Sequence, residues 1–195
     1  VIAQLSGESL GPPFWPNMLS RELFEYGVSR EGRVVKVRLS APVRDMPCLK
    51  LVKEFEVMPS NPAVEVIYWL ENSSDGERTG KLRISSWASL WRAEKLVVPL
   101  ENGLLEAPIV PLEFPGRRGD LPTSPSSYGE GWACYVLRGG LVCGVAWETE
   151  GLEEVDFSGC TLPTLTYRFS AHPCSRTRVA RLAFYVGGGT WGDVR

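Results

Sequence analysis

Apolar and polar residues alternate along several short runs of this chain, and that alternation constrains the fold more than any other feature. The run 49–58, LKLVKEFEVM, collects its apolar residues on one face and its glutamates on the other, with Lys53 as the exception. The run 63–72, AVEVIYWLEN, repeats the pattern. Successive side chains of an extended strand point to opposite faces, so a period of two predicts half-buried β-strands.

The residues PSNP at 59–62 join these two runs, and their composition is typical of a turn. We therefore predict a hairpin whose register sets apolar residues against one another, since a one-residue slip would turn the apolar set to the wrong face. The predicted partners are Val57 with Val64, Phe55 with Val66, and Leu51 with Leu70. The same register places Glu56 opposite Glu65.

Further strands are predicted at 33–40, 81–91, 95–98, 104–110, 165–170 and 176–186. The last run alternates imperfectly, which indicates a bulge or a short helical turn. No segment has a convincing helical period. About ten or more short strands separated by turn signals predict an all-β fold, a large antiparallel β-sandwich with little helix.

A second hairpin is predicted at 132–148, WACYVLRGGLVCGVAWE, with Gly139-Gly140 as a two-residue turn. The predicted partners are Arg138 with Leu141, Val136 with Cys143, Cys134 with Val145, and Trp132 with Trp147. Tyr135 would then lie across from Gly144 and cover it. Cys134 and Cys143 would be diagonal neighbours on one face, where reduced core thiols are favoured over a disulfide.

The organisation we expect is a single β-sandwich domain over residues 1–195, with a long loop at 114–128, FPGRRGDLPTSPSSY. The first residues lack the basic start and long apolar run of a signal peptide. The first residue is not Met, so either a leader was removed or the chain is part of a longer protein, which we favour. A cytoplasmic location is favoured, and no run is long and apolar enough to span a membrane.

The composition excludes several classes of function. The formal net charge is −2 with the charges mixed along the chain, which argues against binding to nucleic acid or to a membrane. The five cysteines form no CxxC motif, so we expect no metal site and no cofactor. Only one Gln and four Asn occur, and 16 of the 21 basic residues are Arg. This composition fits a thermophilic source or a GC-rich genome.

Candidate catalytic residues are few. The chain has one histidine, His172, near Cys174 in SAHPCS, where a structural role in a loop is favoured over catalysis. Glu56 opposite Glu65 is the more interesting pair, because like charges directly opposite destabilise a strand pair. Either a cation such as Lys81 or Arg83 lies between them in a solvent-exposed face, or the two carboxylates serve glycoside chemistry.

An acidic run at 148–156 is predicted to be a solvated loop, with a cation site of oxygen ligands as the alternative. The seven tryptophans are a further signal. Trp69, Trp87 and Trp91 fall on the polar faces of their runs, near Arg83. Exposed aromatic rings beside charged groups suit sugar binding. The alternative is that another layer or another domain covers both faces of the sheet.

The stretch 53–91 resembles the galactose mutarotase-like β-supersandwich, through the pattern V-x-V-x-Y-x-x-x-N carried by Val64, Val66, Tyr68 and Asn72. Domains of this family occur in aldose epimerases and as accessory domains of glycoside hydrolases. The epimerases use two histidines with a carboxylate, and this chain offers only His172. The resemblance therefore implies an accessory domain more than a free-standing enzyme.

Three functions follow from these observations. The first is an accessory β-sandwich of a larger carbohydrate-active protein, which packs on a neighbouring domain and binds glycan through Trp69, Trp87, Trp91 and Arg83. The second is a sugar-active enzyme, a glycoside hydrolase or epimerase, that uses paired carboxylates such as Glu56 and Glu65. The third is a structural or protein-interaction module, with a homo-oligomer as another form of partnership.

Overall fold

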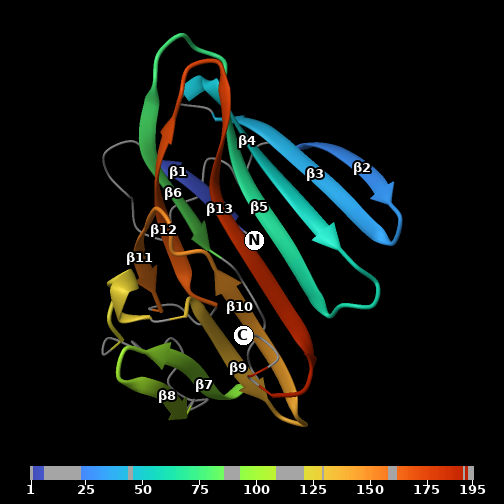
Figure 1. Cartoon of the computed structure of the whole chain (residues 1–195), viewed down its shortest axis with the longest axis vertical. Helices are drawn as coiled ribbons and strands as arrows, with labels where there is room; N and C mark the ends of the chain where they lie inside the picture. The colour runs from blue at the N-terminus through green and yellow to red at the C-terminus, as the bar shows by residue number, and fades with distance from the viewer. Residues whose placement is uncertain are drawn as a thin grey trace.

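The computed structural model of the chain is built almost entirely of β-strands (Figure 1). It describes residues 2–6, 23–43, 46–85, 93–108, 121–128, 130–157, 162–190 and 192. Within these residues the one helical segment is a turn of 3-10 helix, η2 (Pro125–Ser127). No helix in this part of the chain has the length and apolar character needed to cross a membrane.

The strands form two antiparallel sheets. The larger sheet has the order β2 (Glu25–Glu31), β3 (Val34–Val43), β4 (Met46–Val57), β5 (Ala63–Asn72), β13 (Ser175–Gly188), β10 (Leu141–Trp147), β9 (Trp132–Leu137), β7 (Ala93–Leu100) and β8 (Gly103–Pro108). The smaller sheet has the order β1 (Ile2–Ser6), β6 (Arg78–Ser85), β12 (Thr164–Ala171) and β11 (Leu152–Asp156). The prediction of a large antiparallel β-sandwich is confirmed.

The main core lies between the two sheets. It takes the apolar faces of β4 and β5 from the larger sheet and residues such as Leu82 and Ile84 from β6 of the smaller one. The predicted hairpin register of β4 and β5 is confirmed in every pair, including Leu51 with Leu70. Lys53 shares the core face of β4 as the exceptional polar residue, and it is buried at 6% exposure.

The second predicted hairpin has a different register. Leu137, rather than Arg138, is the partner of Leu141, so three residues form the turn instead of two. Gly139 and Gly140 both have positive φ, as expected, but the extra residue shifts the whole pairing by one.

That shift turns side chains to the opposite faces of the sheet. Trp147 and Cys143 join the main core, whereas Trp132 and Cys134 belong to a second apolar cluster on the other side. The predicted pairs of this hairpin are therefore wrong. Tyr135 lies opposite Cys143 rather than Gly144. Cys134 and Cys143 are free thiols, and burial raises the pKa of both.

Other segments refine the expectations. The irregularity in the last strand is a bulge at Val179, where the pairing with β5 shifts between Arg178 and Ala180. Strands β1 and β2 were not expected from the sequence. Of the predicted loop 114–128, residues 114–120 lie outside the described part, and 121–128 are irregular apart from η2.

Candidate functional site

A highly charged surface among the described residues is the outer face of the larger sheet, across β3, β4, β5 and β13. This face arises from the alternation of the strands, because the residues between core positions point outward. The outward side chains of these four strands include Lys36, Arg38, Glu54, Glu56, Glu65, Trp69, Glu71, Arg176, Arg178 and Arg181. We call this set the polar face.

Glu56 on β4 and Glu65 on β5 lie directly opposite each other on the polar face, as the sequence predicts. Each carboxylate has a cationic partner, although Lys36 also binds Glu31 at 2.8 Å. Lys36 Nζ lies 3.5 Å from Glu56, and Arg181 Nη2 lies 2.7 Å from Glu65. The repulsion between the two glutamates is therefore offset from both sides, by β3 and by β13.

The prediction that Lys81 or Arg83 lies between Glu56 and Glu65 is wrong. Both cations lie on β6, and the chain crosses from the larger to the smaller sheet between β5 and β6. There Lys81 pairs with Glu153 at 2.8 Å and Arg83 pairs with Asp156 at 3.3 Å. Because β6 belongs to the smaller sheet, the strand that pairs with β5 opposite β4 is β13, from the C-terminal end of the sequence.

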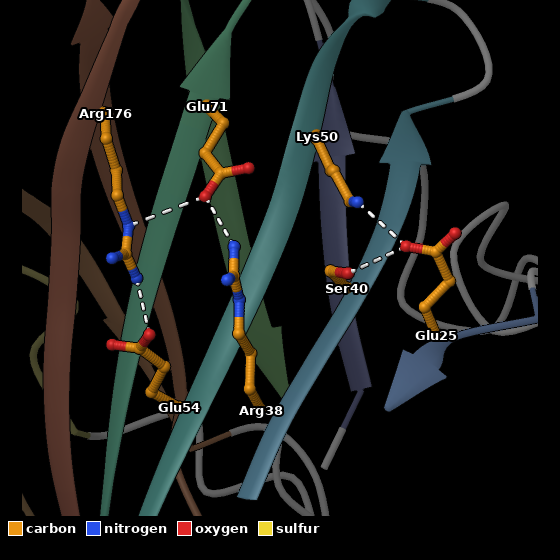
Figure 2. Close-up of polar contacts among 7 residues, drawn as sticks. All are labelled: Glu25, Arg38, Ser40, Lys50, Glu54, Glu71 and Arg176. Atoms are coloured by element: carbon orange, nitrogen blue, oxygen red, sulfur yellow. Dashed lines mark hydrogen bonds and ion pairs between the residues drawn. The ribbon is translucent and has the colours of Figure 1, made fainter. Parts of the chain in front are cut away.

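A ladder of ion pairs runs across the polar face (Figure 2). Arg176 of β13 binds Glu54 at 2.7 Å and lies 3.7 Å from Glu71. Arg38 of β3 binds the same Glu71 at 2.7 Å. Two arginines from strands on either side of β4 and β5 therefore converge on one carboxylate, and the ladder links four strands without a free carboxylate among these residues.

A second group lies toward the edge of the sheet. Glu25 on β2 accepts hydrogen bonds from Lys50 at 2.9 Å and from Ser40 at 3.4 Å (Figure 2). The hydrogen bond and charge of Lys50 hold the pKa of Glu25 below its usual range. The edge strand β2 is thus fixed to β3 and β4 by charge as well as by backbone pairing.

Trp69 lies on the polar face, as predicted, but one side of its ring is covered. The guanidinium carbon of Arg176 lies 4.2 Å from the ring centroid. The indole Nε1 is buried and has no hydrogen-bond partner. Trp69 therefore acts as a platform for an arginine that also belongs to the ion-pair ladder. Trp87 and Trp91 lie outside the described residues.

Arg83 lies on the other side of the molecule. Its neighbours Leu82 and Ile84 point into the core, so Arg83 points out from the smaller sheet, where it is 8% exposed. Trp69 and Arg83 are thus separated by the thickness of the sandwich. The structure does not bring these two predicted ligand-binding residues into one site.

Within the described part of the chain, a polar hollow lies on each sheet. The hollow on the larger sheet has a volume of about 410 Å³ and is lined by Gly27, Val28, Ser29, Glu31, Lys36, Val37, Arg38, Glu54 and Glu56. The hollow on the smaller sheet has a volume of about 490 Å³ and is lined by Lys81, Thr123, Glu153, Glu154 and Thr166. The first contains Glu56, one member of the candidate carboxylate pair.

The acidic run at 148–156 is not the loop that we expected. Residues 152–156 form β11, which pairs with β12. Its Glu153 binds Lys81 and Arg168, and those hydrogen bonds hold the pKa of this carboxyl below its usual range. No group of three metal-ligating side chains lies together within the described ranges.

His172 and Cys174 lie in the turn between β12 and β13 and contact different partners. His172 Nδ1 is 3.9 Å from Glu77, whereas the Cys174 thiol lies 3.7 Å from the Ser74 carbonyl oxygen. The two side chains therefore do not form a Cys/His pair, and each contacts the segment 74–77 separately.

Arg176, Arg178 and Arg181 are the residues of the polar face that sequence reasoning missed. They occupy β13 in the sequence RTRVARL. The sequence does carry a signal for them, because Arg176 and Arg178 are two residues apart and Arg181 follows after three. Because the bulge at Val179 adds one residue, Arg181 returns to the same face as Arg176 and Arg178.

The two antiparallel sheets and the core between them, together with the similarity to solved structures, support a galactose mutarotase-like sandwich fold. The solved structures similar to this chain include three informative cases. The Slr1438 protein of Synechocystis sp. PCC 6803 has a TM-score of 0.55 at 13% identity. A "putative aldose 1-epimerase" of Klebsiella pneumoniae has a TM-score of 0.54 at 10% identity. A GH36 α-galactosidase of Geobacillus stearothermophilus has a TM-score of 0.51 at 11% identity.

The coverage of these matches is unequal. They cover 85%, 88% and 100% of this chain in that order. The chain spans 66% of the Synechocystis protein, 55% of the Klebsiella protein and 28% of the α-galactosidase. Identities this low establish the fold alone. No protein-family model matches the sequence, and no curated protein matches it.

Proposed function

We propose that this chain is an accessory, non-catalytic β-sandwich of a larger carbohydrate-active protein, and that it packs against a neighbouring domain there. The observation that carries the proposal is the state of the carboxylate pair. Glu56 and Glu65 each have a cationic partner within 3.5 Å, so the pair is used to hold strands together. A glycosidase needs one carboxylate as an acid and the other as a base or nucleophile.

The similar solved structures support the accessory role. The α-galactosidases among them are much longer than this chain, which spans 26–28% of their length. A sandwich of this fold thus forms one part of proteins that are named for acting on sugars.

We further propose that glycan binds on the polar face, with Trp69 as the aromatic contact. Sugar hydroxyls can share hydrogen bonds with the Arg and Glu side chains of the ladder, and the Trp69 ring offers a CH-binding surface once Arg176 moves aside. Trp87 and Trp91 remain predicted contacts, and Arg83 would belong to a separate surface.

Two assays test these proposals. On a glycan array, the wild-type chain is expected to bind and Trp69→Ala to lose binding. The control Leu104→Ala removes an exposed apolar side chain from β8, at the opposite end of the sheet, and should bind normally. Absence of binding, or binding unchanged by Trp69→Ala, removes the proposed glycan site.

The second assay follows hydrolysis of aryl glycosides by the purified chain, and no turnover is expected. Turnover that disappears in both Glu56→Gln and Glu65→Gln would contradict the accessory role and support the alternative, a sugar-active enzyme with paired carboxylates.

A further inference from the structure

Among the strands that the structure describes, the larger sheet ends at β2, a seven-residue strand that is exposed along its whole length. All seven of its residues are exposed, and its backbone pairs with β3 on one side. An edge strand presents unpaired N–H and C=O groups that can pair with another chain. Natural proteins blunt such edges with proline, bulges or inward-pointing charges. The sequence of β2, EYGVSRE, contains no proline, and its pairing with β3 shows no bulge. The one charge that points to the core side, Arg30, lies near the end of the strand and donates a hydrogen bond to the Gly32 carbonyl oxygen.

The two faces of β2 differ. Tyr26 and Val28 point to the core side of the sheet, opposite Leu39 and Val37 of β3, and they are 80% and 64% exposed. Glu25 and Ser29 point to the polar face, opposite Ser40 and Lys36. Over residues 25–29 the strand therefore offers an apolar side and a polar side, each continuous with the corresponding side of β3, and Arg30 follows on the apolar side.

We propose that two copies of this chain associate through β2, as antiparallel strands related by a two-fold axis at Gly27. This register pairs Tyr26 with Val28 of the second copy twice, once on each side of the axis. It also pairs Glu25 with Ser29 of the second copy, so no like charges lie opposite. The paired residues point to the same face of the sheet, so the apolar side and the polar side are continuous across the contact.

Charge favours this register over its neighbour. A two-fold axis at Val28 would set Glu25 opposite Glu31 of the second copy at both ends of the contact, and like charges directly opposite are destabilising. Lys50 and Lys36 lie 2.9 Å and 2.8 Å from these carboxylates and offset part of that repulsion. Glu25 and Glu31 are both exposed and lie on the same side of β2. An axis at Gly27 avoids this repulsion and gains two aromatic–aliphatic pairs. The contact is isologous, as in most homodimers, and closes on itself.

Gly27 provides a direct test of the axis. A side chain added at Gly27 meets no atom within 4 Å, so Gly27→Cys can be accommodated. In the proposed dimer the two Cys side chains would face each other across the axis, at the Cα separation of about 4.5–5.5 Å found for opposed residues. That separation lies within the range that a disulfide requires. The experiment uses a Cys174→Ser background, because Cys174 is an exposed free thiol.

Sedimentation of the wild-type chain is expected to show a mass that rises with concentration from 21.6 kDa toward twice that value. Val28→Lys places a charge on the apolar side of the edge and should weaken association by at least about tenfold. Val186→Lys is the matched control, because Val186 is 61% exposed but lies on β13, a central strand of the larger sheet rather than an edge strand. It should associate as the wild type does. Circular dichroism checks that both variants fold.

Under mild oxidation Gly27→Cys is expected to form a covalent dimer, whereas the Cys174→Ser background should not. A chain that stays monomeric at every concentration overturns the proposal. A dimer that Val28→Lys leaves intact also overturns it, as does a dimer in which Gly27→Cys fails to cross-link. None of these results depends on carbohydrate binding, so the outcome is independent of the proposed function.

Discussion

Arg181 donates two hydrogen bonds to one carboxylate oxygen of Glu65, from Nε at 3.1 Å and from Nη2 at 2.7 Å. These bonds and the charge of Glu65 raise the pKa of the guanidinium above its usual value. Arg181 is thereby the cation that permits Glu65 to lie opposite Glu56. The contact joins strands that are 116 residues apart in the sequence.

Arg181→Ala should destabilise the fold, because it leaves Glu65 and Glu56 as opposed charges with one cation. Both partners of the pair are partly exposed, so we expect a loss of about 0.5–1 kcal/mol in the free energy of unfolding. Urea titration at low and high salt measures it, and salt should shrink the loss. Lys95→Ala breaks an exposed pair with Glu106 that has no opposing carboxylate, and it should cost less. Equal losses would contradict this explanation.

Lys53 should make the stability depend on pH. Burial on the core face of β4 lowers the pKa of Lys53 to about 8, although Phe24 lies 4.4 Å from its ammonium. The unfolded chain keeps the usual pKa of about 10.4, so between these values the unfolded state binds more protons. The free energy of unfolding should therefore rise from pH 8 to pH 10, by at most about 3 kcal/mol.

Lys53→Met removes this dependence and should stabilise the protein at pH 7, since the cost of burying the charge is gone. Chemical denaturation across this pH range measures both effects. Lys50→Met provides the control, because Lys50 lies on the opposite face of β4 and is exposed. A stability profile that keeps its slope in Lys53→Met would show that another group is responsible.

Asn72 should be the most sensitive polar residue of the core. Its Nδ2 contacts the carbonyl oxygens of Gly76, Ala171 and His172 at 2.8–3.1 Å, and its Oδ1 accepts from Ser74. Asn72 thus ties the crossing between the sheets to the turn that precedes β13.

Asn72→Asp replaces the donor with an acceptor that faces three carbonyl oxygens. We expect a loss of at least about 2–3 kcal/mol in the free energy of unfolding, partly recovered at acid pH when the carboxyl is protonated. Thermal unfolding at pH 7 and at acid pH tests it. In Asn61→Asp the side chain still accepts from the Ala63 amide, so that control should change little. A mild effect of Asn72→Asp would mean that its contacts are replaceable.

Gly131 is required at the start of β9. It has a φ of 62°, and a Cβ added there would lie 2.6 Å from the carbonyl oxygen of Trp147. Gly131→Ala should therefore cost several kcal/mol or prevent folding, because both strain and a backbone clash oppose it. Gly188→Ala has open space around its Cβ and should be tolerated. Soluble yield and thermal unfolding of the two variants give the comparison.

The comparison of the two hairpins shows how far local pattern can predict this fold. The β4–β5 hairpin is predicted in full because its apolar residues match in one register only. In the β9–β10 hairpin both strands are apolar on both faces, so the pattern fits two registers equally well, and the three-residue turn decides between them. Gly139 and Gly140 can adopt the positive φ of a two-residue or a three-residue turn, so they do not distinguish the two registers.

The sequence alone determined the alternation of the strands, the register of β4 with β5, and therefore the opposition of Glu56 and Glu65. These depend on neighbours along the chain and on the period of an extended backbone. Only the tertiary structure decided which cations neutralise that pair. The chain crosses to the second sheet after β5, and β13 inserts between β5 and β10 with its three arginines. Strand order is set by how two sheets bury one shared core, and no local pattern encodes it.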